Sequence, residues 1–200
     1  MEVTSQGENR RETVRASSCD GFSIIEVIGA FFVIMVALTG LLALCSHAVA
    51  TMMLMQDLLV AKQKSREALE SIYTARNTQQ LSFDMIQNVS DAADGIFLDG
   101  FQPLRKANPT GVLGDGLIGT ADDGPIESLT LPGEDGLVGT GDDEIRVLSS
   151  FEREIKIDPV LYADDTVNPD VRKVQVIIRY SNPLGGQRTF EVESYISRFR

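Results

Sequence analysis

One long apolar segment near the N-terminus constrains this chain more than any other feature. Residues 22–50 read FSIIEVIGAFFVIMVALTGLLALCSHAVA and hold one acidic side chain, Glu26. A membrane helix needs about 20 predominantly apolar residues. This segment is longer than that, and it is too long for the apolar region of an ordinary secretory signal. No second segment of this kind follows, so the sequence predicts a single membrane-spanning helix at residues 22–50.

The apolar pattern continues beyond this segment in an amphipathic form. Apolar or small residues recur every three or four positions, and neither Pro nor Gly interrupts residues 41–94. This spacing predicts an amphipathic helix at residues 51–80. The stripe spans about three heptads and is rich in Ala, which favours packing on a sheet over a coiled coil. The predicted buried stripe is Leu54, Leu58, Ala61, Ser65, Ala68, Ile72 and Ala75, and the predicted outer faces carry Lys62, Lys64, Arg66, Glu67 and Glu70.

The C-terminal part of the sequence has the alternation of β-strands. Strands are expected at residues 151–157, 171–180 and 188–199, and a hairpin loop of sequence SNPLGGQ at residues 181–187 joins the last two. Three antiparallel strands with one apolar face need a cover, which the amphipathic helix can supply. The predicted fold class is therefore α+β, with a long N-terminal helix packed on a small antiparallel sheet. Phe190, Val192 and Ile196 are expected on one face of the last strand.

The segment between the helix and the strands lacks a clear period. Residues 76–110 contain several turn signals and are expected to form an irregular connection. Ser82 is a candidate cap for a short helix through Asn88. Together with the strands, this segment belongs to a globular head that is predicted to span residues 81–200.

The start of the apolar segment carries a motif of its own. Gly21 is followed by Phe22, a short apolar run and then Glu26. An ionised carboxylate near hydrocarbon costs a few kcal/mol unless it is paired. Taken alone, Glu26 also fits an acid at the headgroup level of a membrane. The junction as a whole closely resembles the leader site of type IV prepilins, and the resemblance continues more loosely to the C-terminus.

This resemblance implies specific processing and partners. It implies a leader peptide at residues 1–21, cleavage by a prepilin peptidase between Gly21 and Phe22, and N-methylation of Phe22. The head would be pilin-like and would lie in the periplasm, held by one span in the bacterial inner membrane until an assembly platform adds the subunit to a filament of other pilins or pseudopilins. In the dry core of such a filament Glu26 needs a cation, which the amine of a neighbour's Phe22 would supply.

Two departures from the family pattern stand out. The leader holds four acidic residues beside its three arginines, so the positive-inside rule gives little support for its orientation. The apolar helix also lacks the proline that many pilins carry. The layout resembles minor pilins and minor pseudopilins of type II secretion, which the sequence does not separate. The alternative function is a membrane-anchored calcium-binding or adhesive module that never polymerises.

An acidic internal repeat occupies residues 114–144. The nonapeptide DGLIGTADD at residues 115–123 returns as DGLVGTGDD at residues 135–143. Carboxylates and backbone carbonyls of compact Asp/Gly loops are the oxygens that Ca²⁺ prefers, which predicts one Ca²⁺ per copy. The alternative is a pair of solvated acidic turns. The candidate ligands are Asp115, Asp122 and Asp123 in the first copy and Asp135, Asp142 and Asp143 in the second.

Composition excludes other classes of function. The net charge of −11 argues against nucleic acid as the main partner, because phosphate binding needs surplus Lys and Arg. His47 is the single histidine, and the two cysteines, Cys19 and Cys45, lie in or before the apolar segment. Nucleophilic or acid–base catalysis would therefore depend on carboxylates alone. The chain is predicted not to be an enzyme.

Overall fold

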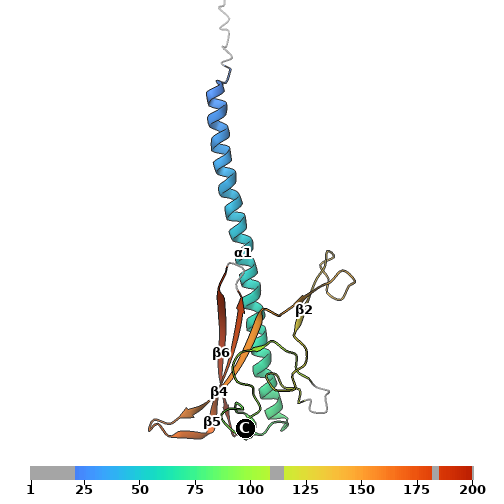
Figure 1. Cartoon of the computed structure of the whole chain (residues 1–200), viewed down its shortest axis with the longest axis vertical. Helices are drawn as coiled ribbons and strands as arrows, with labels where there is room; N and C mark the ends of the chain where they lie inside the picture. Colours follow the sequence, from blue (N-terminus) through green and yellow to red (C-terminus); the bar gives the residue numbers. More distant parts are fainter. Residues whose placement is uncertain (1–20, 109–114, 182–184, 200) are drawn as a thin grey trace, which may run out of the picture. The chain divides into compact units, whose positions relative to one another are not determined.

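The computed structural model describes residues 21–108, 115–181 and 185–199. The predicted leader up to residue 20, residue 114 of the repeat segment and the tip of the last hairpin at 182–184 lie outside the described residues. The chain divides into two compact units, Met1–Ser46 and His47–Arg200. One helix, α1 at Ile24–Asn77, runs through both (Figure 1).

The part of α1 in the first unit is apolar on every side. Its large hydrophobic residues from Ile24 to Leu44 are all exposed. Among the described helices, α1 alone is long and apolar enough to cross a membrane, and none of its most apolar 18 residues is buried. The predicted membrane-spanning helix is thus confirmed as a helix of suitable length and composition.

The part of α1 in the second unit packs against the sheet, as expected from the amphipathic pattern. Ala61, Ala68 and Ile72 are fully buried, and Ala75 is nearly so. The predicted stripe is wrong at its N-terminal end, where Leu58 is 37% exposed. It is also wrong about Lys64, which was expected on an outer face but is buried. Ion pairs account for the difference, because they bring charged side chains into the buried face: Asp57 pairs with Arg146 at 2.7 Å, and Lys64 pairs with Glu127.

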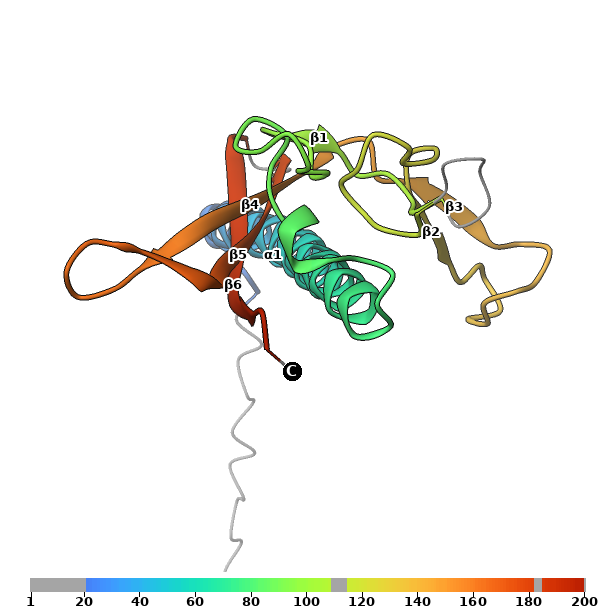
Figure 2. The ribbon, with the colours of Figure 1, turned by 90° about the horizontal axis from the view of Figure 1, so that it is seen from below.

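The main sheet has four antiparallel strands in the order β1-β4-β5-β6, beside which α1 lies (Figures 1 and 2). The strands are β1 Gln102–Pro103, β4 Phe151–Leu161, β5 Val167–Ser181 and β6 Gln187–Ser197. Alternate side chains of β4 and β5 face α1. Ile155, Val174 and Val176 of these strands form one core with Ala68 and Ile72 of α1. The predicted α+β arrangement, a long helix on a small antiparallel sheet, is confirmed.

The last hairpin agrees with its prediction. Ser181 pairs with Gln187 across β5 and β6, so the chain reverses between these residues. Ile196 is buried, and Phe190 and Val192 pack against the same core. All three lie on the face that the alternation predicted.

The connection after α1 is irregular, as expected. The short helix predicted within it, from Ser82 to Asn88, is not formed as predicted. The only helical turn there in the described chain is η1, Phe83–Met85, and Ser82 makes no side-chain cap hydrogen bond. The prediction of a helix through Asn88 is wrong because the Asn88 side chain binds the backbone of β4. Its buried side chain accepts a hydrogen bond from the Ile157 N–H and donates one to the Ile155 carbonyl, both at 2.8 Å. The amide therefore ties the connection to β4.

A second, two-stranded sheet was not predicted. It consists of β2 Ser128–Leu131 and β3 Glu144–Val147, paired antiparallel. The second copy of the acidic repeat connects these two strands. The first copy precedes β2, so the two copies occupy different positions in the head.

Candidate functional site

The Gly21–Phe22 junction lies immediately before α1 and outside regular secondary structure. The Ser23 carbonyl accepts hydrogen bonds from the Glu26 N–H at 3.0 Å and the Val27 N–H at 3.2 Å, which sets the first helical turn. Phe22 is 82% exposed. A side-chain carbon added at Gly21 would meet no described atom within 4 Å. Within the described residues, neither Gly21 nor Phe22 is covered by other parts of the chain.

Glu26 lies in the first turn of α1. An acid there interacts favourably with the helix dipole. In the described part of the chain no cation forms an ion pair with this exposed carboxylate. The geometry leaves Glu26 available to a positive group from outside the molecule.

The first acidic loop is closed by its own carboxylates. Asp115 accepts a hydrogen bond from the Leu117 N–H at 2.8 Å, and Asp122 accepts one from the Asp115 N–H at 3.1 Å. Asp123 accepts one from the Gly119 N–H at 2.9 Å. Each of the three predicted ligands thus satisfies a backbone donor of the loop, which is the ordinary role of Asp in turns.

The second loop repeats these contacts. Asp135 accepts from the Leu137 N–H at 2.8 Å, Asp142 from the Asp135 N–H at 3.3 Å, and Asp143 from the Gly139 N–H at 2.6 Å. The glycines at the second and fifth positions of both copies have positive φ, between 68° and 98°, a conformation that glycine adopts without steric cost. The nonapeptide is therefore a structural unit as well as a sequence repeat.

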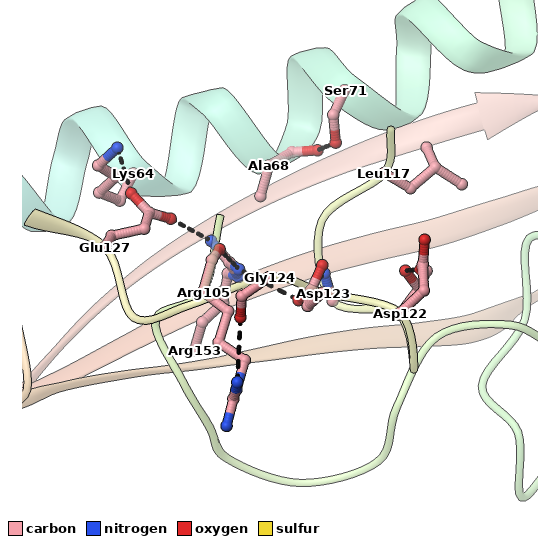
Figure 3. Close-up of polar contacts among 12 residues, drawn as sticks. Lys64, Ala68, Ser71, Arg105, Leu117, Asp122, Asp123, Gly124, Glu127 and Arg153 are labelled. Carbon is pink, nitrogen blue, oxygen red and sulfur yellow. Dashed lines mark hydrogen bonds and ion pairs between the residues drawn. The ribbon is translucent and has the colours of Figure 1, made fainter. Parts of the chain in front are cut away.

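A buried ionic cluster joins the first loop to α1 and β4 (Figure 3). Arg153 of β4, whose side chain is 3% exposed, lies 3.6 Å from Glu127 and 3.9 Å from Asp123. Glu127 in turn pairs with Lys64 of α1, and Lys64 pairs with Glu67 at 2.7 Å. Because buried charges are tolerated only when they are paired, this cluster fixes how these segments meet.

The sequence contained a signal for part of this cluster. Along β4, Arg153 occurs between Phe151 and Ile155 at the same parity, so strand alternation places it on the buried face. Lys64 is next to Ser65 of the predicted stripe, within the width of a helical apolar face. Glu127 has no such signal, since it lies in a turn-rich segment before a strand that was not expected.

The predicted calcium ligands are brought together within each copy, but they are occupied by hydrogen bonds of the loop. Among the residues that the structure describes, no group of three or more His, Cys, Asp or Glu side chains is arranged to hold a metal ion. One carboxylate oxygen of Asp123 is buried without a hydrogen-bond partner. Calcium binding stays a prediction.

Thermal unfolding of the full chain in detergent tests it. If each loop binds Ca²⁺ in the folded state alone, a hundredfold excess over Kd adds about 2.7 kcal/mol per site, and the melting temperature rises relative to a chelator control. Asp143→Asn should remove part of this rise, while Glu144→Gln, outside the nonapeptide, should keep it. An unchanged melting temperature, or an equal rise with Mg²⁺, identifies ordinary acidic turns.

The pH dependence of stability tests the placement of Asp123. Burial raises the pKa of Asp123 to about 6, against the opposing effects of the Gly119 N–H and Arg153. Between its ordinary value near 4 and this value, the unfolded chain releases the proton that the folded chain keeps. Its contribution to the free energy of unfolding therefore falls as pH rises from about 4 to about 6.

The measurement is the melting temperature in chelator at pH 5 and pH 7. Wild type is expected to gain stability relative to Asp123→Asn as pH is lowered, because asparagine takes up no proton. A difference between the two proteins that does not change with pH would show that Asp123 is ionised in both states.

Comparison with known proteins assigns no family. No protein-family model matches the chain, and no curated protein or solved structure matches it either.

Proposed function

We propose that this chain is a prepilin-type structural subunit, a minor pilin or a minor pseudopilin of type II secretion. A prepilin peptidase removes residues 1–21, and α1 then holds the subunit in the bacterial inner membrane with its head in the periplasm. Assembly places the apolar part of α1 in a filament core. The observation that carries the proposal is the sequence Gly21, Phe22 and Glu26 directly at the start of a helix long enough to span a membrane.

The architecture of the head agrees with this role. One face of the second half of α1 is buried against an antiparallel sheet, while the first half exposes apolar side chains on all sides. Such a helix is soluble only in lipid or in contact with other apolar helices. The combination of Gly21, Phe22 and Glu26 favours a processed subunit over a plain anchor, because an anchor requires no cleavage junction before its helix.

Substitution of Glu26 tests assembly. Glu26→Leu is expected to keep cleavage and membrane insertion but to lower incorporation into sheared filaments by about tenfold or more, because the amine of a neighbour's Phe22 loses its partner. Glu70→Ala, which removes an exposed acid from the same helix, is the matched control and should assemble normally.

The same experiment separates the two functional classes. Wild-type amounts of Glu26→Leu in sheared filaments would count against the assembly role. Complete absence of the wild-type chain from filaments, in cells that make them, would favour the anchored calcium-binding or adhesive module.

A further inference from the structure

The two copies of the nonapeptide have the same internal structure but opposite surroundings. In the first copy the two apolar residues are buried, with Leu117 2% and Ile118 3% exposed. In the second copy their counterparts Leu137 and Val138 are 62% and 64% exposed. The three hydrogen bonds from backbone N–H groups to aspartates are the same in both copies, so the main difference between the copies is what covers each of them.

The first copy shows what kind of surface this nonapeptide fits. The Gly119 carbonyl accepts a hydrogen bond from the Leu98 N–H at 2.9 Å. A side-chain carbon at Gly119 would lie 2.6 Å from Ile155, so the backbone approaches β4 closely. Leu117 and Ile118 enter the core that includes Ile155, and Asp123 faces the guanidinium of Arg153. The receiving surface is an apolar slot with an arginine at its edge.

The second copy presents the same features outward. It connects β2 to β3, which is tied to α1 by the ion pair of Arg146 with Asp57. Leu137 and Val138 are adjacent in the loop, and no covering contact buries either side chain. In the strand that follows, Ile145 and Val147 are also exposed, at 68% and 54%. Exposed large apolar side chains of this kind are candidates for an interaction surface. The three aspartates of the loop disfavour an anionic lipid surface or a nucleic acid as the ligand.

We propose that residues 135–143 form a docking loop that inserts Leu137 and Val138 into an apolar slot beside an arginine on a different protein. Asp143 pairs with that arginine as Asp123 pairs with Arg153 here. We infer a different protein because, in the part of the chain that the structure describes, the slot that receives such a loop is filled by the first copy. The loop is held in its bound conformation before docking, which lowers the entropic cost of association.

Site-specific photo-crosslinking of the full chain in the membranes of its own cells tests this docking. The probe is p-benzoylphenylalanine at position 138. The same residue at position 162, which is an exposed apolar site between β4 and β5, is the control. Position 138 is expected to give one major adduct with another protein, mapped by mass spectrometry to apolar residues adjoining an arginine. Position 162 is expected not to give this adduct.

The charge pair gives the decisive comparison. Asp143→Asn keeps an oxygen for the Gly139 N–H but removes the charge. In membranes kept in chelator, so that Ca²⁺ does not contribute, it should lower the yield of the adduct by about fivefold or more. Glu144→Gln should leave the yield unchanged. Adducts only with a second copy of this chain or only with lipid, no adduct at all, or a yield indifferent to Asp143→Asn would each overturn the proposal.

Discussion

Replacing Arg153 with methionine is expected to lower the free energy of unfolding of the head by about 3–5 kcal/mol, the range for removing one partner of a buried ionic contact. The guanidinium lies against Glu127 and Asp123, whose side chains are 4% and 7% exposed. Without it, two buried carboxylates lose a cation, and the Arg105 carbonyl loses a donor at 3.2 Å. The first acidic loop should consequently be held to β4 less firmly, by its buried apolar residues and without the ionic contact.

The measurement is denaturant-induced unfolding of the full chain in detergent, followed by circular dichroism because the chain contains no Trp. Lys173→Met is the matched control: its ammonium pairs with Glu193 at 2.6 Å, but both side chains are partly exposed, and such pairs contribute about 0–1 kcal/mol. Asp123→Asn in the Arg153→Met background should recover part of the loss, since it removes an unpaired buried charge. Equal effects of Arg153→Met and Lys173→Met would contradict the structural role of the cluster.

Replacing Gly21 with leucine is expected to lower processing by about tenfold or more, because the peptidase must fit the residue before the cut. Gly21→Ala should be tolerated better. The side chain added at this position meets nothing within 4 Å in the described structure, so a loss of cleavage reports on recognition by the peptidase and not on misfolding. The measurement is the ratio of uncleaved to cleaved chain in membranes that contain active peptidase.

Ser23→Ala is the control for this substitution, since it changes a neighbouring side chain but keeps the carbonyl that sets the first turn of α1. It should be processed as wild type is. Processing of Gly21→Leu at the wild-type level would mean that the glycine has no role in cleavage.

The periodic parts of the fold could be predicted from the sequence. The apolar segment and the stripe from Ala61 onward predict a helix, and the alternation from Phe151 to Ile157 predicts a strand with one buried face. Both predictions succeed because burial of one face imposes the period of the element on the sequence. The structure extends the strands predicted at residues 151–157 and 171–180, whereas the last strand, predicted to reach residue 199, ends at Ser197. In β5 the pairing continues to Val167 through polar residues, which carry no hydrophobic signal.

The non-periodic parts could not be predicted in the same way. β2 and β3 have four residues each, and pairing between them depends on contacts distant in sequence. The Asn88 side chain forms hydrogen bonds with β4 residues that lie 67 and 69 positions later in the sequence. No local pattern indicates such distant partners. The repeat is apparent in the sequence. The burial of one copy and the exposure of the other depend on where β4 and the buried ionic cluster around Arg153 lie.

The central claim is tested most directly by the mass of the N-terminal peptide of the native protein, purified from membranes of cells with an active prepilin peptidase. The proposed function predicts a chain that begins at Phe22 with one methyl group on its amine, with residues 1–21 absent. An intact chain beginning at Met1 in those membranes would contradict it.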